Sequence, residues 1–424
     1  MRTKTHAAIN RATNERRHPA GIKDRRLLAG ILVLVLFFAC SSRTPSDVSN
    51  LSWDQILAAG RNTNVTLMMW GGDPYINAYM NKYIKPQLKD HYGITLNISE
   101  GQGNKIVQIL MTEMEAKKSE SQIDLCWING ETFYQLRQID ALYGPFTAKL
   151  PNAQYIDFQN PFIRYDFQQE VQGMECPWGN VQLAIIYNSE HVQNPPQNMS
   201  ELERYVKEHS GKFTIGSDFT GMTLLKSFLI ALAGGKQVLS GPFDQTKYEK
   251  YSKELWEYLN RIKPYFWKGG KTFPDAVAPM HQMFASGELD FTMSNNDGEV
   301  DNKVLQGLFP KSSRAYVPEI GTIQNSHYMG IVKQSSNKAG AMIVCNFLIS
   351  PEAQLEKLKP AVWGDGTILD INKLPTNWQQ QFRNVPGRHY APNRSEINQR
   401  ALPELAPEYM IHLYDDFRKY VIEQ

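Results

Sequence analysis

Short apolar runs alternate with helical apolar faces along most of the chain. The first run, residues 65–70, reads Val-Thr-Leu-Met-Met-Trp and precedes a helical stretch from Ile76 to about Lys89. Further apolar runs at 94–98 and 123–128 flank a segment, 105–116, with apolar residues at helical spacing. Strands separated by helices indicate a parallel sheet with crossover connections. The pattern therefore predicts an α/β fold.

The pattern recurs later in the chain in a way that suggests two lobes. Strands are expected at 181–187 and 327–332, more than a hundred residues apart. Between them we expect a second α/β unit, with helices at 224–233, 248–261 and 276–285 and a strand at 289–293. A chain that leaves one lobe and returns to it forms a hinged cleft, and hinges let lobes close on a ligand.

These signals give the domain limits. Residues 65–180 are predicted as the first part of lobe 1, 181–326 as lobe 2, and 327–424 as the return to lobe 1 plus C-terminal helices. Residues 40–64 are polar apart from a short amphipathic piece and are expected to form a tether. About 385 residues after residue 39 exceed what one hydrophobic core usually serves, in agreement with two lobes.

The N-terminus has the pattern of an export signal, which we assign to residues 1–39. The first 26 residues contain 8 of the 45 basic and 2 of the 43 acidic residues, and an uncharged run, Leu27 to Ala39, follows. A membrane-spanning helix needs roughly 20 apolar residues, so this run is too short to span a bilayer. A basic region before a short apolar region is typical of a secretory signal.

Cys40 closes that apolar run. The residues Leu36-Phe37-Phe38-Ala39-Cys40 resemble a bacterial lipobox, with Phe37 where a smaller aliphatic residue is usual. Cleavage after Ser41, with Ala39 and Ser41 as the small residues, is the alternative. We favour lipidation of Cys40, because a cysteine is rare at this position otherwise. A lipid chain there would keep the protein at a membrane surface in the periplasm or cell envelope.

Charge and cysteine content exclude several classes of function. Without the first 26 residues the formal charge is −4, so no clustered basic surface is expected and no nucleic-acid partner is predicted. Cys126, Cys176 and Cys345 have no metal-ligand spacing. Two of them could pair in an exported protein, or all three could be buried thiols. We predict neither a metal nor a cofactor.

Two loops in the first lobe have the chemistry of a small-molecule site. In open sheets the ligand lies beyond the carboxyl ends of the strands. Trp70, Gly71 and Gly72 follow the first predicted strand, and Asn129 follows the third. Glycine lets backbone amides approach a ligand, and asparagine offers a donor and an acceptor. The alternative is that the glycines form turns and Trp70 belongs to the core.

The second lobe offers two more candidates. Asp218, Thr220, Gly221 and Thr223 precede or begin the helix at 224, where the helix dipole favours a carboxylate or phosphate group. Ordinary capping of that helix explains the same residues. Asn295 and Asn296 follow the strand at 289–293 and could fix a polar ligand, or simply form a turn.

Aromatic residues favour a different ligand. Trp70, Trp178, Tyr187 and Trp363 are predicted at strand ends, crossovers or loops, and we include them in the site. Stacked rings hold flat heterocycles or cations, so a thiamine-like or other nitrogenous cation is the leading prediction. Sugars stay possible, whereas ferric iron is disfavoured because no paired tyrosines or His and carboxylate cluster stand out. Trp127 alternates with Ile128 on a strand and is assigned to the core.

Several segments of the chain resemble the extracellular solute-binding proteins of ABC importers, which have the class-two, two-lobed periplasmic-binding-protein fold, and most closely their YnjB-type subgroup. This resemblance extends from about Val65 to about Leu374. It rests on Pro177-Trp178-Gly179 before 183–188, Lys212-Phe213-Thr214, 218–221 with Leu225-Lys226, 286–290, Gly321-Thr322-Ile323, 346–354 and Trp363-Gly364-Asp365.

The resemblance implies two lobes, each a mostly parallel sheet flanked by helices, with two crossover strands at the hinge. It also implies a monomer that captures a small-molecule solute and delivers it to an ABC permease powered by its ATPase. Fold analogy does not settle the substrate.

Motifs of common enzymes are missing from the sequence. No H-E-x-x-H or G-x-S-x-G occurs, and Ser335 to Lys338 matches S-x-x-K without its partner motifs. We therefore predict that the chain is not an enzyme. Two alternatives remain open: an exported enzyme that uses Asp218, Glu288 or Asp297, and an envelope lipoprotein that only bridges other proteins.

Overall fold

A mixed sheet of seven strands organises the first half of the protein in the computed structural model, which describes residues 47–424. Strands β1 (Asn64–Met69), β2 (Thr95–Glu100) and β3 (Leu125–Ile128) pair in parallel, in the order β2-β1-β3. The three strands predicted near the N-terminus are therefore confirmed, together with their parallel direction.

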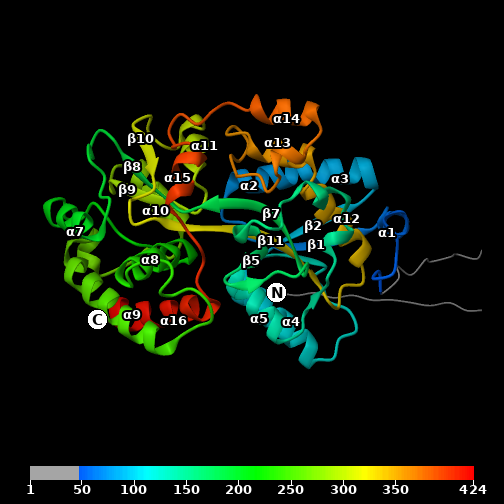
Figure 1. The fold of residues 1–424 in the computed structure, drawn as a ribbon, viewed down its shortest axis with the longest axis horizontal. Coiled ribbons are helices and arrows are strands. Elements are labelled where there is room, and N and C mark those ends of the chain that lie inside the picture. Colours follow the sequence, from blue (N-terminus) through cyan, green and yellow to red (C-terminus); the bar gives the residue numbers. More distant parts are fainter. Residues whose placement is uncertain (1–46) are drawn as a thin grey trace, which may run out of the picture. The chain divides into compact units, whose positions relative to one another are not determined.

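The other side of β3 is covered by β11 (Thr322–Val332), which runs antiparallel to it. β11 also pairs with β7 (Glu175–Gln182) and, at its ends, with β4 (Leu142–Tyr143) and β12 (Ala401–Leu402). This one strand has four partners from distant parts of the sequence. Figure 1 shows β7 and β11 running side by side across the middle of the described chain.

Both faces of this sheet are covered by helices, which explains the apolar runs in its strands. Val65, Leu67 and Met69 of β1 pack into one core, and Met68 packs into the core on the opposite face. The first core includes residues from α1 (Trp53–Gly60), α2 (Pro74–Ala78), α3 (Lys85–Tyr92), α12 (Lys338–Leu348) and α13 (Pro351–Leu358); the second includes α4 (Gly103–Glu115) and α5 (Gly130–Gln138).

A second sheet lies in the other half of the protein. Strands β10 (Ser313–Tyr316), β8 (Ala184–Asn188) and β9 (Phe291–Ser294) form it in that order, all antiparallel. Helices cover its two faces: α7 (Met199–Glu208), α8 (Phe219–Leu232), α9 (Gln245–Ile262), α10 (Val277–Ala285) and α16 (Pro407–Phe417) contribute to the larger core, and α11 (Glu299–Leu305) to the smaller one.

The antiparallel direction of the second sheet differs from the mostly parallel sheet predicted for each lobe. Residues 189–290 connect β8 to β9 through four helices. A connection of that length can return the chain to either end of a strand, so alternation of strands and helices does not fix the direction of pairing. The helices predicted at 224–233, 248–261 and 276–285 are confirmed as α8, α9 and α10.

The chain passes between the two halves at Leu183. The strand predicted at 181–187 is in fact two strands, because β7 ends at Gln182 and β8 begins at Ala184. The amide of Leu183 donates to the carbonyl of Ile323 at 2.9 Å, so the break lies against the first part of β11. β7 then pairs in the first sheet and β8 in the second.

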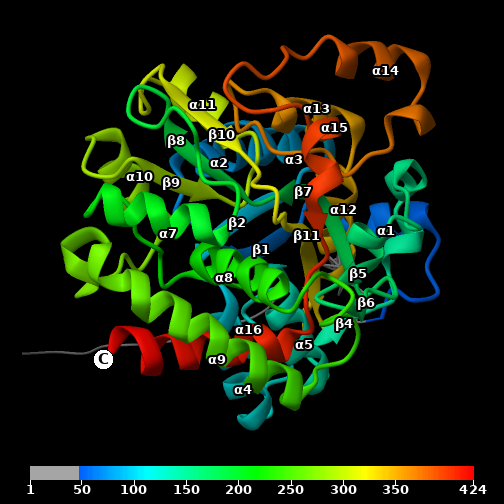
Figure 2. The same ribbon diagram turned by 60° about the vertical axis from the view of Figure 1, so that its left-hand side comes forward.

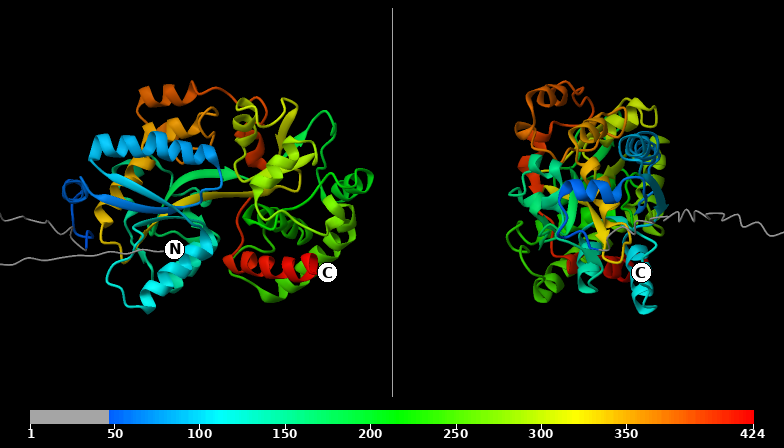
Figure 3. Two further views of the ribbon diagram at one scale, coloured as in Figure 1. Left: turned by 180° about the vertical axis from the view of Figure 1, so that it is seen from behind. Right: turned by 90° about the vertical axis from the view of Figure 1, so that its right-hand side faces the viewer.

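Residues after 327 contribute to both halves. Helices α12 and α13 pack on the first sheet, whereas Tyr409, Leu413 and Phe417 of α16 belong to the core of the second half. In Figure 2, α16 lies beside α8 and α9, and the view from behind in Figure 3 shows the same red helix against green helices. Along the chain, α14 (Thr376–Arg383) and α15 (Arg394–Ile397) lie between α13 and α16.

Part of the predicted tether is packed against the protein. Ser52 and Gln55 form a capping box that begins α1, with the amide of Gln55 donating to Ser52 Oγ at 3.3 Å and that of Ser52 to Gln55 Oε1 at 2.9 Å. Ile56 and Gly60 are buried against α12. Residues 53–60 are therefore held on the first half, and Cys40 lies outside the described residues.

Cys126, Cys176 and Cys345 are all free and buried. Of the two possibilities that the sequence left open, buried thiols are therefore observed. Among residues 47–424, no helix has both the length and the apolar character that crossing a bilayer requires.

Replacement of Gly60 by alanine tests the contact between α1 and α12. An added Cβ would lie 2.7 Å from the Gly340 amide nitrogen and 2.7 Å from Ile343 Cδ1. We expect Gly60→Ala to lower the free energy of unfolding by about 1–3 kcal/mol, as overpacking does. Urea unfolding monitored by tryptophan fluorescence measures this. Ala58→Ser, on the exposed face of α1, is the control and should change it by less than about 0.5 kcal/mol.

Candidate functional site

Charged and polar side chains from both halves meet beyond the ends of β1, β3 and β9. We call this set the junction site. It contains three groups of interacting side chains and, besides them, four residues of the loops after β1 and β3. The groups comprise Asp73, Glu131, Thr220, Lys226, Asn295, Glu299, Lys303 and Glu404, and the loop residues are Trp70, Gly71, Gly72 and Asn129.

The first group joins the loop after β1 to helix α11. The ammonium of Lys303 pairs with the carboxylate of Asp73 and, at 3.1 Å, with Glu299. Asp73 also begins α2, because its Oδ1 accepts from the amides of Tyr75 at 2.7 Å and Ile76 at 3.0 Å. One carboxylate thus caps a helix in the first half and pairs with a lysine from the second.

The charges in this group stabilise one another although they are buried. Lys303 is only 4% exposed. Burial alone would lower its pKa, but the carboxylates of Glu299 and Asp73 raise the pKa of Lys303 above its usual value. Its ammonium lies 5.0 Å from the centroid of the Tyr75 ring, a cation–π distance. Lys303 is therefore charged at neutral pH and is held by two carboxylates and a ring.

The second group lies at the start of α8. Asn295 Nδ2 donates to Thr220 Oγ1 at 3.0 Å, which brings together two of the predicted loops. Asp218 caps α8 by accepting from the Gly221 amide at 3.0 Å. Asn296 accepts from the amide of Gly298 at 3.0 Å, and its buried Nδ2 has no hydrogen-bond partner in the described chain.

The third group surrounds Lys226 of α8. This lysine is fully buried, pairs with Glu404, and lies 4.0 Å from the centroid of the Phe167 ring and 5.7 Å from that of Phe219. Phe167 reaches this position because Gly130, at the start of α5, has no side chain: a Cβ there would lie 1.9 Å from the Phe167 ring. Phe167 has a φ of 45°, a costly conformation for a residue other than glycine.

Glu131 completes the third group from the first turn of α5. Burial raises the pKa of its carboxyl group to about 7, although the nearby charge of Lys226 lowers it. Its Oε2 is buried and accepts no hydrogen bond in residues 47–424. A carboxylate oxygen without a donor, near neutrality in pKa, is suited to accept a hydrogen bond from a ligand.

The predicted loop of Trp70, Gly71 and Gly72 directly precedes Asp73, which pairs with Lys303. A Cβ on Gly72 would lie 2.5 Å from the Trp70 ring, so the indole lies directly on the backbone of Gly72. Asn77 Nδ2 donates to the carbonyl of Gly71 at 2.8 Å and fixes the loop. Trp70 and Asn129 are both half-buried.

Four predicted site residues have other positions. Trp178 is fully buried between Trp127 and Trp363, at ring distances of 5.0 and 5.3 Å, and Trp363 is 6% exposed. Thr223 is buried and donates to the Phe219 carbonyl at 2.8 Å within its own helix. Tyr187 pairs with Phe291 at the opposite end of the second sheet from Ser294, which precedes Asn295.

Gly221 lets the start of α8 pack against the loop that precedes it. A Cβ at this position would lie 1.8 Å from the carbonyl oxygen of Gly216, so only glycine lets the start of α8 approach the preceding loop so closely. With Asp218 as the cap, two of the predicted residues build the helix start, and Thr220 points to Asn295.

The charged members of the site were not predicted from the sequence. Asp73 and Glu131 were next to the chosen residues, but Lys226, Glu299, Lys303 and Glu404 were not considered as ligand contacts. One signal was available: Lys226 is a lone charge in the apolar helix Met222 to Leu232. Nothing local marked Lys303, because its partner Asp73 lies 230 residues away.

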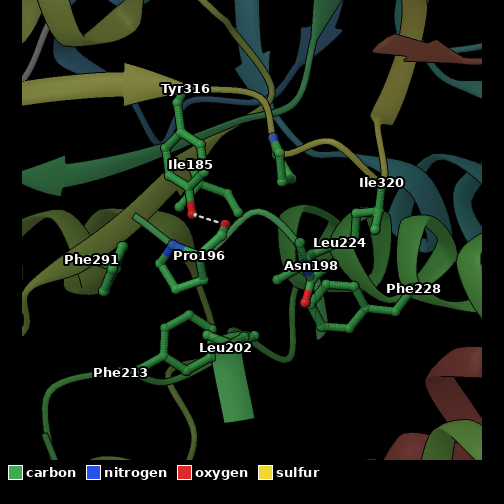
Figure 4. Close-up of a pocket in the computed structure, with 11 residues that line it drawn as sticks. Ile185, Pro196, Asn198, Leu202, Phe213, Leu224, Phe228, Phe291, Tyr316 and Ile320 are labelled. Carbon is green, nitrogen blue, oxygen red and sulfur yellow. Dashed lines mark hydrogen bonds between the residues drawn. The ribbon is translucent and has the colours of Figure 1, made fainter. Parts of the chain in front are cut away.

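Two other findings limit the chemistry. In the described part of the chain no three His, Cys, Asp or Glu side chains are grouped so that they could hold a metal ion. Figure 4 shows an apolar cavity inside the second half, lined by residues such as Leu202, Phe228 and Tyr316. Its volume of about 20 Å³ is room for a single water molecule.

Comparison with known proteins identifies the family. Residues 82–381 match the family described as bacterial extracellular solute-binding protein. The chain belongs to this family. It is also 33% identical over 366 residues to Protein YnjB of Escherichia coli (strain K12), with 85% of this chain and 94% of YnjB covered. Both results confirm the predicted relationship.

Solved structures with the same fold are more distant in sequence. The spermidine/putrescine ABC transporter substrate-binding protein PotD from Streptococcus pneumoniae has a TM-score of 0.58 at 16% identity, covering 84% of this chain and 99% of PotD. The TpPotD lipoprotein of Treponema pallidum has a TM-score of 0.61 at 15% identity, covering 85% of this chain and all of that one (100%). The predicted class-two binding-protein fold is confirmed.

Membership of the family also confirms that this solute-binding protein is not an enzyme. The exported enzyme considered from the sequence is therefore set aside.

A double-mutant cycle on Lys303 and Asp73 tests the buried ion pair between the halves. Lys303→Met leaves two carboxylates buried without their cation, so we expect it to lower the free energy of unfolding by about 3–5 kcal/mol. Adding Asp73→Asn should restore part of this loss, with a coupling of about 1–3 kcal/mol by urea unfolding. Additive effects of the two substitutions would contradict a direct interaction.

Proposed function

We propose that this chain is the solute-binding component of an ABC importer, and that it binds its solute in the junction site. The observation that carries this proposal is the Lys303 ion pair with Asp73 and Glu299. It joins the two halves beside Trp70 and Gly72 on one side and Ser294 and Asn295 on the other. A solute bound there would contact both halves at once, as delivery to a permease requires.

A nitrogenous cation is the ligand class that the site supports best. The protein already holds two ammonium groups there, each between carboxylates and an aromatic ring: Lys303 near Tyr75 and Lys226 near Phe167. Glu131 offers an oxygen without a donor, and Trp70 a half-buried ring. Such surroundings favour amines and thiamine-like heterocycles by charge and by cation–π attraction.

The name of the S. pneumoniae relative, a spermidine/putrescine binding protein, is consistent with this class. Sugars are the alternative, since Asn129, Asn295 and Trp70 could hold hydroxyl groups and stack on a ring. The net charge of the ligand distinguishes the two classes, because only a cation is attracted by the ionised carboxylate of Glu131.

The mechanism we propose is capture by closure. Ligand enters while the halves are apart, the second half rotates about the crossing at Leu183 and β11, and the permease recognises the closed form. The open and closed forms must be close in free energy without ligand, so that binding decides between them. The Lys303–Asp73 ion pair joins the two halves in the closed form, whereas Glu299 and Lys303 both lie on α11 and pair in either form.

Anchoring at Cys40 completes the proposal. Lipidation there would keep a monomeric binding protein at the membrane near its permease and ATPase, with the segment from 41 to about 52 as the remaining tether. A protein that bridges envelope components without binding a solute is the second candidate.

Thermal unfolding of residues 44–424 against a panel of solutes tests ligand capture. The panel contains putrescine, spermidine, thiamine and its phosphates, sugars and metal ions. A ligand that binds only the folded protein stabilises it by about 2.7 kcal/mol at a hundredfold excess over Kd. We expect an upward shift of Tm with one class of amine. No shift with any solute, and no solute carried through purification, would favour the bridging role.

Replacement of Glu131 by glutamine tests its charge in binding. Wild-type affinity for the amine identified above should fall as pH drops below about 7, because Glu131 then gains a proton. Glu131→Gln should bind about tenfold or more weakly at pH 8 and lose this pH dependence, as a charge-assisted hydrogen bond is removed. Isothermal titration calorimetry at several pH values measures both effects.

A measurement of stability distinguishes a loss of ligand binding in Glu131→Gln from misfolding of the variant. Burial raises the pKa of Glu131 in the folded protein, so the wild type loses stability as pH rises from about 4.5 through 7. Glu131→Gln removes that loss and should be more stable than the wild type at pH 8. Glu120→Gln, at an exposed position, is the control. Equal binding by the two variants would exclude Glu131 from the site.

A further inference from the structure

A second cavity lies between helix α11 and the chain from Leu358 to Arg394. Its volume is about 280 Å³, far more than a single water molecule needs. The lining includes Asp301 of α11 and, from the later chain, Leu358, Thr367, Phe382, Val385 and Arg388. No member of the junction site lines this cavity, so it is a separate space.

The carboxylates at this cavity already have their hydrogen bonds. Asp301 accepts from three backbone amides, those of His389 at 2.7 Å, Tyr390 at 3.2 Å and Ala391 at 3.0 Å. Asp297, buried next to the cavity, accepts from Arg394 at 2.8 and 3.1 Å and from the Gln182 amide at 3.0 Å. It also pairs with Arg388 at 2.5 Å. A ligand cation would therefore find no free acceptor among them.

Hydrogen-bond donors at the cavity remain available. Within residues 47–424, the hydrogen bonds and ion pairs of the Arg388 side chain all use Nη1, to Asp297 and to the Pro392 carbonyl at 3.3 Å. Its Nε and Nη2 have no protein acceptor, and 16% of the side chain is exposed. Arginine presents Nε and Nη2 as a planar fork that matches a carboxylate.

Apolar side chains form part of the lining. Leu358, Phe382 and Val385 line the cavity together with Pro360 and Pro386. Pockets of this kind, apolar with a few fixed polar groups, bind small organic molecules, and the polar groups set their orientation. Here the fixed group is a guanidinium with two free donors.

We propose that this cavity is a second binding site, which takes a small carboxylate with an apolar body. The carboxylate would accept from Nε and Nη2 of Arg388, and the body would lie against Phe382 and Val385. Such an occupant contacts α11 and the segment 382–388 at once, so it would stabilise their packing. The inference does not depend on the ligand of the junction site.

Binding of benzoate and cyclohexanecarboxylate to residues 44–424 tests this proposal, with benzyl alcohol as the uncharged control. We expect saturable binding of the two carboxylates by calorimetry and a matching rise in Tm, with much weaker binding of benzyl alcohol. Arg388→Lys keeps a cation for Asp297 but loses the fork, and should weaken carboxylate binding about tenfold or more.

Val385→Phe fills the cavity and should abolish carboxylate binding without changing Arg388. Arg383→Lys, at an exposed position on α14, is the matched control and should bind as the wild type does. No binding at about 10 mM, where even millimolar affinity is detectable, would overturn the proposal. Binding that survives both Arg388→Lys and Val385→Phe would overturn it equally. Amine binding at the junction site should be the same in all three variants.

Discussion

Strand β11 is the constraint on which the arrangement of the two halves depends. Over 11 residues it pairs with β3 and β4 at one end and with β12 at the other, and with β7 over most of its length. Ile323 belongs to the core of the second half, whereas Met329 and Ile331 belong to the core of the first. Because one strand enters both cores, the ends of β1, β3 and β9 face a common space.

The charges in that space are costly to the fold. Lys226, Lys303 and Asp166 are buried, Glu131 and Glu299 are half-buried, and burial raises the pKa of Asp166 well above its usual value. Replacing buried ion pairs by well-packed apolar residues is often neutral or stabilising. The proposed ligand binding and closure give these charges a role beyond folding. The same reasoning applies to Phe167, whose strained backbone places its ring under Lys226.

The two cavities and the junction site differ in which hydrogen-bonding groups lack a partner. The 20 Å³ cavity is almost wholly apolar and offers no free charge. At the junction site Glu131 Oε2 is an acceptor without a partner, which agrees with the amine that we propose, and the neighbouring Asn296 Nδ2 is a donor without one. At the larger cavity Asp301 and Asp297 are bonded and Arg388 keeps free donors, so an acceptor is complementary. Unpaired acceptors at a site thus favour a ligand that donates hydrogen bonds, and unpaired donors favour a ligand that accepts them.

The sequence by itself determined the fold class, most of the elements and the family. Apolar periodicity is a local property, so β1, β2, β3, α4 and α9 could be predicted from neighbouring residues. The loops at strand ends could be predicted for the same reason, and Trp70, Asn129 and Asn295 do lie directly after β1, β3 and β9, whereas Thr220 lies in the first turn of α8. Only the tertiary structure decided that Trp178 is core, that the second sheet is antiparallel, and that Asp73 meets Lys303 and Lys226 meets Glu404. Those partners are 230 and 178 residues apart. A charge has no periodicity that indicates its distant partner, and burial of a tryptophan depends on what packs against it from elsewhere in the chain.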